Sequence, residues 1–342
     1  MSINIISYPT ADESLGEHLG ENEAETAQQI AELINQHAAN TYKPGGFRRP
    51  VHTKAHGCVK AEFRVLPNLP AELARGIFQP GAVYPATIRY SNASSNPDQA
   101  DNRSDARGMA IKLFNIQQPS LLESWQDLHT QDFILFNHPF FMVNTAQQYL
   151  ELIKDVNGIS LLDKMSLPFD LGLRGMVNTF KISHGKIANP LHVQYYSAVP
   201  YQLGADAPKL VVKYSVKPAE YINPENIPEH PDPNYLREVM QTTLMQEAVD
   251  LKFMLQLRKD GMDVENAQVA WSEDSSPFIE VAVIHIPKQE FNTAAQNLEC
   301  ENLSFNPWHC TADHRPLGAI NRIRKVVYTQ ASQFRHAENN PL

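Results

Sequence analysis

The sequence predicts an α+β protein built on an eight-stranded antiparallel β-barrel, with inserted and C-terminal helices. Two observations carry this prediction. Eight short segments either alternate apolar and polar residues or are apolar throughout, as β-strands are. Helical spacing falls mostly after the fourth of these segments and towards the end of the chain, and this order is typical of an antiparallel barrel rather than of a parallel α/β sheet.

Composition argues against several classes of protein. The chain has 342 residues, of which 42% are apolar, so a sizeable core is expected. It carries 38 acidic and 29 basic residues, a formal net charge of −9, and no Lys/Arg block. This balance argues against nucleic acid or an anionic membrane surface as a partner. The sequence has neither a run of 18 apolar residues nor an evident leader at residues 1–9, so we expect a soluble, cytoplasmic protein without an integral membrane segment.

The N-terminal part is expected to hold an arm, a helix and the first strand. Residues 1–20 are polar and without pattern, so they should form an arm that orders on contact or a frayed tail. Apolar spacing predicts a helix over residues 21–39, and Lys43–Phe47 should be a turn. Residues Val59–Val65 alternate apolar and charged, which predicts a strand with one solvent-exposed face.

The remaining elements follow from the same patterns. Seven further strands are predicted, at residues 86–91, 108–114, 132–136, 192–199, 209–216, 250–257 and 278–286. Helical spacing appears at residues 146–156, around 161–180 and at 234–247, and the proline-rich residues 220–233 should form a long ordered loop. No repeat or linker is evident, so one domain is expected, with residues 1–45 as its arm and helix and residues 46–342 as the barrel.

A C-terminal helix begins near Arg315, with Pro316 in its first turn, and runs past Arg335. At about 100° per residue, Tyr328 lies roughly 40° around the helix from Arg324, and Arg335 roughly 20° from Arg324. One phenol and two guanidiniums therefore share a face. A positive charge one turn away favours the phenolate, which can bind ferric iron, and Arg335 would suit a carboxylate such as a haem propionate. The alternative is a surface helix with scattered arginines.

The pattern Arg324-x-x-x-Tyr328, followed seven residues later by Arg335, resembles the proximal haem-ligand helix of the catalase superfamily. In that family the tyrosine is the axial ligand of the iron, and the arginine one turn earlier keeps it ionised. The longer run His314–Arg322 resembles a narrower branch, the small catalase-related haem proteins and the catalase-like allene oxide synthases.

A second matching stretch contains a histidine. Arg49-x-Val51-His52 resembles the distal-histidine segment of catalases, in which the histidine moves a proton between the two peroxide oxygens and the arginine holds a propionate. Thr53 stands where catalases commonly have alanine, and one extra residue precedes the next aromatic residue. His56 is therefore a rival, although only His52 keeps the spacing from the arginine. Without the resemblance, a lone histidine is more often an ordinary core or loop residue.

Two predicted strands and the loop between them extend the match. Arg89-x-Ser91 and the run Asp105–Phe114 resemble the catalase strands that carry another propionate arginine and an Arg-Gly step, so Arg89 is the third candidate propionate partner. Its alternative role is a salt bridge on a strand.

The distal side departs from the family. The asparagine that hydrogen-bonds peroxide in catalases falls on His129 or Thr130, and neither residue is an amide. This mismatch argues against full catalase activity. Phe140 or Phe141 could stack on a haem, although adjacent aromatic residues are more often part of a core.

Three cysteines, Cys58, Cys300 and Cys310, are too few for a disulfide framework. Cys310 is next to His309 and close to His314, but this spacing matches no zinc signature. We expect these cysteines to be ordinary loop residues.

Taken over residues 46–336, the resemblance implies a haem-binding barrel with haem b (ferric iron) as cofactor. The residues implied are His52 as the catalytic residue, Tyr328 as the iron ligand, and Arg49, Arg89, Arg324 and Arg335 as further haem partners. The implied activity is that of a haem-dependent peroxidase or catalase-related oxidoreductase, which heterolyses hydrogen peroxide or organic hydroperoxides. The alternatives are dehydration of a lipid hydroperoxide to an allene oxide, encouraged by apolar residues 140–142, and a haem-binding scaffold without turnover. A homodimer is left open as the assembly.

Overall fold

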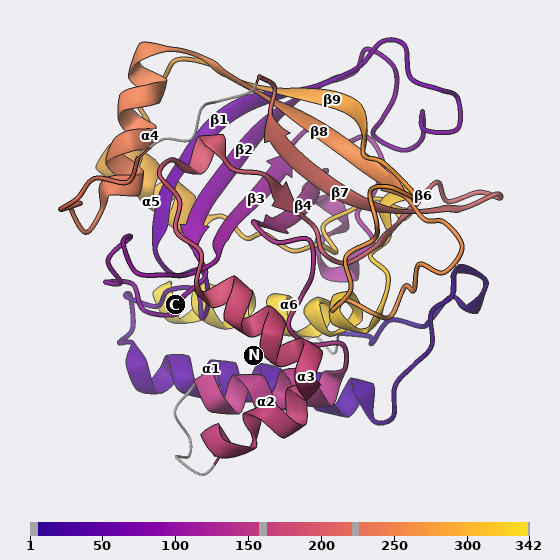
Figure 1. Ribbon diagram of the computed structural model, residues 1–342, viewed down its shortest axis with the longest axis horizontal. Helices are drawn as coiled ribbons and strands as arrows, with labels where there is room; N and C mark the ends of the chain where they lie inside the picture. Colours follow the sequence, from indigo (N-terminus) through magenta and orange to yellow (C-terminus); the bar gives the residue numbers. More distant parts are fainter. Residues whose placement is uncertain (1–5, 157–162, 221–225, 341–342) are drawn as a thin grey trace.

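Antiparallel strands form a closed β-barrel (Figure 1). The computed structural model describes residues 6–156, 163–220 and 226–340. Within them the strands are β1 (Ala55–Val65), β2 (Val83–Asn92), β3 (Arg107–Leu113), β4 (Gln131–Phe136), β5 (Tyr195–Tyr196), β6 (Tyr201–Leu203), β7 (Leu210–Pro218), β8 (Val249–Leu257) and β9 (Ile279–Ile286). The order is β5-β4-β3-β2-β1-β9-β8-β7-β6, and β5 also pairs with β7. That last pairing closes a ring of eight strands and leaves β6 beside β7, outside the ring.

The barrel interior is aromatic. On β1 the side chains alternate, with Val59, Ala61, Phe63 and Val65 buried and the residues between them exposed. Phe63 and Phe133 pack against Phe253 with ring centroids 5.0 and 4.7 Å apart, and Tyr214 meets Phe133 edge to face at 4.9 Å. Burial of these large rings supplies much of the hydrophobic stabilisation of the barrel.

Helices cover one side of the barrel. The described helices are α1 (Glu23–Thr41), α2 (Ala146–Val156), α3 (Asp163–Ser183), α4 (Tyr235–Gln246), α5 (Ala294–Asn302) and α6 (Ala319–Asn339). Helices α1, α2, α3 and α6 lie together beneath the barrel in Figure 1, where α1 packs against both α2 and α6. Helices α4 and α5 instead contact β1. None of the helices in the described residues is both long and apolar enough to span a membrane.

The predicted fold class is confirmed, and each predicted strand coincides with a strand of the barrel ring. The predicted strand at residues 192–199 is reduced to the two residues of β5. The three-residue strand β6 and the helix α5 were not predicted. Residues 161–162 of one predicted helix and residues 221–225 of the predicted loop lie outside the described residues.

Helix α6 begins four residues later than the sequence indicates. Pro316 lies outside the helix and forms a β-bridge with Tyr201. Gly318 precedes the first helical residue with φ of 84°, and a Cβ there would lie 2.7 Å from the carbonyl oxygen of Val264. Only glycine fits this position, because a side chain would be strained by the backbone angle and would collide with the loop.

Carboxylates from two distant segments hold the N-terminal end of α6. Glu17 accepts a hydrogen bond from the Gly318 N–H at 2.8 Å, and Glu265 accepts one from the Ala319 N–H at 2.6 Å. Arg322, which is fully buried, forms ion pairs of 2.7 to 2.8 Å with Glu17, Glu23 and Glu265. These contacts order the described part of the N-terminal arm against α6, and they match the preference of helix N-termini for negative charge.

A disulfide corrects one expectation from the sequence. Cys58 on β1 is bonded to Cys300 on α5, 242 residues away. The two cysteines are therefore not ordinary loop residues, whereas Cys310 is free and buried. The histidines near Cys310 have other partners, because His309 lies 3.0 Å from Asp132 and His314 accepts the Ile77 N–H.

Candidate functional site

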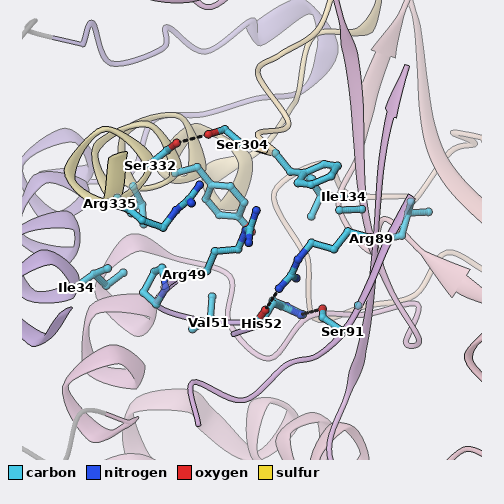
Figure 2. Close-up of a pocket in the computed structure, with 18 of the residues that line it drawn as sticks. Ile34, Arg49, Val51, His52, Arg89, Ser91, Ile134, Ser304, Ser332 and Arg335 are labelled. Atoms are coloured by element: carbon cyan, nitrogen blue, oxygen red, sulfur yellow. Dashed lines mark hydrogen bonds between the residues drawn. The ribbon is translucent and has the colours of Figure 1, made fainter. Parts of the chain in front are cut away.

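A cavity lies between the barrel and the helices below it (Figure 2). One wall is the face of β2, β3 and β4 that points away from the barrel interior, and the other is formed by α1, α2 and α6. The cavity has a volume of about 120 Å³. Its lining residues are Ile34, Arg49, Pro50, Val51, His52, Arg89, Ser91, Gly108, Met109, Ala110, Ile134, Leu135, Tyr149, Ile153, Ser304, Phe305, Val327, Tyr328, Ala331, Ser332 and Arg335.

Five of the six predicted site residues line this one cavity. They come from the segment before β1 (Arg49 and His52), from β2 (Arg89) and from α6 (Tyr328 and Arg335). The fold therefore brings together residues that are almost 290 positions apart in the sequence. The exception is Arg324, which lies one helical turn before Tyr328 but does not line the cavity.

The cavity carries an excess of positive charge. Arg49, Arg89 and Arg335 line it, and none of its lining residues is an aspartate or glutamate. Burial and the neighbouring Arg49 hold the pKa of Arg89 well below its usual range, and the same two causes lower the pKa of Arg335 to about 10. The positive charges of these three guanidiniums repel one another, so an anion bound among them would stabilise their charged form.

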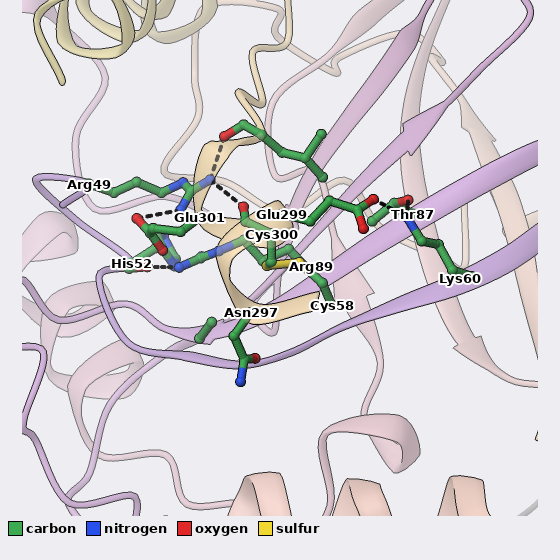
Figure 3. Close-up of a disulfide and its surroundings, with 12 residues drawn as sticks. Arg49, His52, Cys58, Lys60, Thr87, Arg89, Asn297, Glu299, Cys300 and Glu301 are labelled. Atoms are coloured by element: carbon green, nitrogen blue, oxygen red, sulfur yellow. Dashed lines mark hydrogen bonds and ion pairs between the residues drawn. A yellow bond between two sulfur atoms is a disulfide. The ribbon is translucent and has the colours of Figure 1, made fainter. Parts of the chain in front are cut away.

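Backbone carbonyls hold these guanidiniums in place. Arg49 and Arg335 both donate to the carbonyl oxygen of Leu303, just after α5, at 2.5 and 3.1 Å. Arg49 also pairs with Glu301 at 2.9 Å (Figure 3), and Arg89 donates to the His52 carbonyl oxygen at 2.7 Å. The three side chains are therefore oriented before any ligand binds.

Some buried donors remain unpaired in the described residues. The Nε atoms of Arg89 and Arg324 are buried and make no hydrogen bond there. An unpaired buried donor costs about 1 to 3 kcal/mol, more when it is charged, so a bound acceptor would relieve this cost. Of these two, Arg89 lines the cavity, and its unpaired Nε and the lining charge fit an anionic ligand such as the propionates of a haem.

His52 has a left-handed backbone conformation that few residues other than glycine adopt, and its side chain is held in one orientation. Its backbone has φ of 54°, and its Nδ1 lies 3.1 Å from the Ser91 hydroxyl oxygen. A Cβ at Gly108 would lie 2.5 Å from that same nitrogen, so only glycine leaves room for the ring. Burial and the positive charge of Arg89 and Arg324 lower the pKa of His52 to about 4. The imidazole is therefore neutral near pH 7, and Nε2 is the ring nitrogen left to exchange a proton with a ligand.

The rival histidine lies elsewhere. His56 on β1 does not line the cavity, and its Nδ1 lies 3.7 Å from an oxygen of the buried Asp101. Burial and the nearby Arg107 hold its pKa well below the usual range. Of the two candidates, His52 alone faces the cavity.

Tyr328 contributes a half-buried phenol that lines the cavity and makes no hydrogen bond within the described residues. Its oxygen is therefore available to a ligand. Arg324 lies 3.4 Å from the Asn321 side-chain oxygen and 5.3 Å from the centre of the Phe141 ring. Arg324 lies one helical turn before Tyr328, as predicted, and makes no direct hydrogen bond to it among the described side chains.

The residues at the position of the distal asparagine of catalases lie outside the cavity. Neither His129 nor Thr130 lines the cavity; His129 is exposed, and its Nδ1 lies 3.0 Å from the Ile116 carbonyl oxygen. Phe140 and Phe141 do not line the cavity either, and Phe141 packs against Tyr149 and Arg324 instead. Ile134 and Phe305 present apolar surface to the cavity.

Several lining residues had no assigned role in the sequence interpretation. Ser91 and Gly108 belong to the matched strand pattern, and their contacts with His52 give them a function there. Tyr149 and Phe305 belong to no recognised motif. Burial and the nearby Tyr328 raise the pKa of Tyr149 to about 12, so Tyr149 is a second phenol beside the predicted ligand.

Comparison with known proteins agrees with this fold. No family model matches the chain. A catalase-related peroxidase from Mycolicibacterium paratuberculosis is 21% identical over 268 residues, which cover 75% of this chain and 79% of that protein. The structure is similar to a fungal catalase (TM-score 0.70, 16% identity) and to catalase A from Saccharomyces cerevisiae (TM-score 0.67, 16% identity).

These structural matches cover 96% and 97% of this chain but only 66% and 68% of the two catalases, so the chain spans about two thirds of their length. A bacterial catalase matches with a TM-score of 0.61 and 16% identity, over 98% of this chain and 63% of the catalase. The barrel and its covering helices have the catalase fold. The predicted resemblance to the catalase superfamily is confirmed.

Proposed function

We propose that this chain is a haem-dependent, catalase-related peroxidase that cleaves the O–O bond of hydrogen peroxide or an organic hydroperoxide. The observation that carries the proposal is the cavity itself. It joins an unpaired phenol, a neutral imidazole and three arginines, with no carboxylate in its lining. The catalase fold and the name of the peroxidase relative support an oxidoreductase of this kind.

The residues of the cavity fit a haem in their chemistry. Tyr328 on α6 would supply a phenolate oxygen to the ferric iron, the ligand that catalases use. Arg49, Arg89 and Arg335 would hold the two propionates, since guanidiniums bind carboxylates through paired hydrogen bonds. Arg324 would add positive charge behind Tyr328, through its position one turn away rather than through a hydrogen bond. The bound haem would supply the redox chemistry that no side chain of the cavity provides.

His52 would move the proton. Because its imidazole is neutral near pH 7, Nε2 can accept a proton from an incoming peroxide. The same nitrogen then returns that proton to the departing oxygen, so the oxygen leaves as water or an alcohol and not as an anion. Ser91 holds Nδ1 during both transfers and keeps the ring in the orientation that the transfers need.

The missing amide favours peroxidase over catalase activity. In the described cavity no side-chain amide stands beside His52, so the group that orients peroxide in catalases has no counterpart there. A second hydrogen peroxide would be positioned less well, whereas an external electron donor needs no such group. We therefore expect organic donors to be oxidised faster than oxygen is evolved.

An absorption spectrum before and after addition of peroxide tests this function. Protein produced with a haem supply should bind haem and show a Soret band that changes on addition of hydrogen peroxide. Oxidation of a phenolic donor without comparable oxygen evolution would support a peroxidase. A protein that binds no haem contradicts the proposal. Loss of the conjugated diene of a lipid hydroperoxide in the absence of a donor would instead favour the allene oxide reaction.

A further inference from the structure

The disulfide lies near two arginines of the cavity, Arg49 and Arg89 (Figure 3). Cys300, in the last turn of α5, is bonded to Cys58 on β1. The backbone carbonyl of Cys300 accepts a hydrogen bond from Arg49 at 3.1 Å, and the next residue, Glu301, forms the ion pair with Arg49. The disulfide therefore anchors the segment that orients this guanidinium.

Arg335 depends on the same segment. It donates to the carbonyl oxygens of Glu301 and Leu303, and Arg49 shares the second of these acceptors. Two of the three cavity arginines are thus held by carbonyls at the C-terminal end of α5, where the helix dipole places partial negative charge. A shift of this end would displace both guanidiniums together.

Apart from the bonds that Arg49 and Arg335 donate to its C-terminal end, helix α5 has few contacts with the barrel strands in the described residues. Cys300 is its one buried residue, and its large apolar residue Leu298 is 63% exposed. The ion pair between Glu299 and Lys60 on β1 joins side chains that are 56% and 57% exposed, and surface pairs of this kind contribute at most about 1 kcal/mol. The disulfide is therefore the main bond between α5 and the barrel.

The disulfide lies beside a surface cavity, at a cysteine that is itself only 4% exposed. Cys300 lines a second cavity, of about 600 Å³, which opens between α4, α5 and the segment before β1. Three basic residues (Arg48, Lys54 and Arg237) and two acidic residues (Glu238 and Glu301) also line it, which leaves one net positive charge in its lining. Positive charge near a disulfide favours the thiolate form of an approaching thiol, which is the form that attacks.

We propose that the Cys58–Cys300 disulfide is a thiol-exchange site, and that its redox state controls how firmly Arg49 and Arg335 are held. A low-molecular-weight thiolate attacks Cys300 Sγ, a new S–S bond forms, and the electron pair of the old bond leaves on Cys58 Sγ. A second thiol displaces the first, so two thiols are oxidised to a disulfide and the protein disulfide gains two electrons. Reduction frees α5 and loosens both arginines. The expected weakening of haem binding rests on the function proposed above, whereas the loosening of α5 does not.

Hydrogen exchange tests the loosening directly. The full chain, purified without reductant, is treated with dithiothreitol, and exchange of residues 294–303 is measured before and after treatment. We expect faster exchange in this segment after reduction. The Cys300→Ser variant should exchange as fast without treatment and should not respond to dithiothreitol. Cys310→Ser, which alters the free cysteine, should behave like the wild type.

Haem release provides the second readout. Reduction should raise the rate of haem transfer to an excess of haem-scavenging protein by about 10- to 100-fold, the range found when outer partners of a bound metal group are lost. Unchanged exchange of residues 294–303 after full reduction would overturn the proposal, as would free thiols at Cys58 and Cys300 in the untreated protein. If the chain bound no haem, the proposed function would fail, and the exchange experiment would still decide the role of the disulfide.

Discussion

The surrounding protein keeps His52 neutral and oriented, and a neutral imidazole has a free nitrogen lone pair that can accept a proton. Gly108 leaves room for its ring, Ser91 fixes Nδ1, and the nearby arginines oppose a positive charge on it. The resemblance to catalases predicted the histidine itself. It did not predict how Gly108 and Ser91 hold the ring, because this arrangement depends on the register between two strands and the segment before β1.

Replacing His52 should slow the reaction with peroxide without removing haem. We expect His52→Ala to reduce the rate of the first change in the haem spectrum by about 10²- to 10⁴-fold, the usual contribution of a positioned acid or base. His56→Ala is the matched control, since His56 is also buried but lies outside the cavity. Stopped-flow absorbance measures both variants. Equal rates for His52→Ala and the wild type would remove this histidine from the mechanism.

The same residue predicts the pH dependence of the rate. Because the pKa of His52 is lowered to about 4, the neutral form predominates above that pH and the protonated form below it. The rate constant with peroxide should therefore be nearly constant from about pH 5 to 8 and fall by about tenfold per unit below pH 4. The measurement is stopped-flow kinetics in pH jumps short enough to precede acid unfolding. A midpoint near pH 6.5, the value of a free histidine, would contradict this environment.

At the scale of elements, the N-terminal end of α6 is held by a buried ion cluster of Arg322 with Glu17, Glu23 and Glu265. Burial lowers the pKa of Arg322, but the hydrogen bonds that it donates to Glu23 and Glu265 outweigh this effect, and the net pKa is raised. Burial raises the pKa of Glu23, but the hydrogen bonds donated by Arg322 and Tyr8 lower it by more, so the net pKa is lowered. The cluster fixes the start of the helix that carries Tyr328.

Removing the arginine of this cluster should be strongly destabilising. Arg322→Met leaves three carboxylates without their shared partner, and we expect a loss of about 3 to 5 kcal/mol in the free energy of unfolding. The matched control is Arg64→Met, which breaks an ion pair with Glu62 whose side chains are 46% and 52% exposed and should cost less than about 1 kcal/mol. Denaturant titration measures both losses. A similar small loss in the two variants would show that the buried cluster contributes little.

Helices and strands could be predicted where their spacing of apolar residues is regular over a short stretch of sequence. The alternation in β1 and the spacing in α1 and α6 follow from side chains a few residues apart. Strand β6 was missed because three residues carry too little periodicity, and α5 because its one buried residue leaves no apolar stripe. The disulfide was missed because its cysteines are 242 residues apart and meet only once the barrel has closed.

At the scale of the whole molecule, buried histidines link folding to pH. Burial lowers the pKa of His314 to about 3 and, with nearby positive charges, that of His52 to about 4 and that of His56 well below its usual range. In the unfolded chain each histidine titrates near pH 6.5. The unfolded state therefore binds more protons than the folded state below that pH, and stability falls as the pH is lowered.

This linkage predicts the slope of stability against pH. Each such histidine should lower the free energy of unfolding by up to about 1.4 kcal/mol per pH unit between roughly pH 6 and 4.5. His314→Gln removes one of these buried imidazoles, so the slope of its stability against pH should be smaller than that of the wild type. Urea titrations at several pH values give the slope. A wild-type stability independent of pH across this window would contradict the burial of these imidazoles as neutral groups.

In the proposed function the Tyr328 phenol reaches a haem iron in the cavity between the barrel and α6. The most direct test compares the visible absorption spectra of ferric, haem-loaded wild type, Tyr328→Phe and Tyr149→Phe, since Tyr149 is the second phenol in that cavity. We predict a phenolate charge-transfer band that is present in the wild type and in Tyr149→Phe and absent from Tyr328→Phe. If Tyr328→Phe had the same spectrum as the wild type, Tyr328 would not be the ligand of the iron.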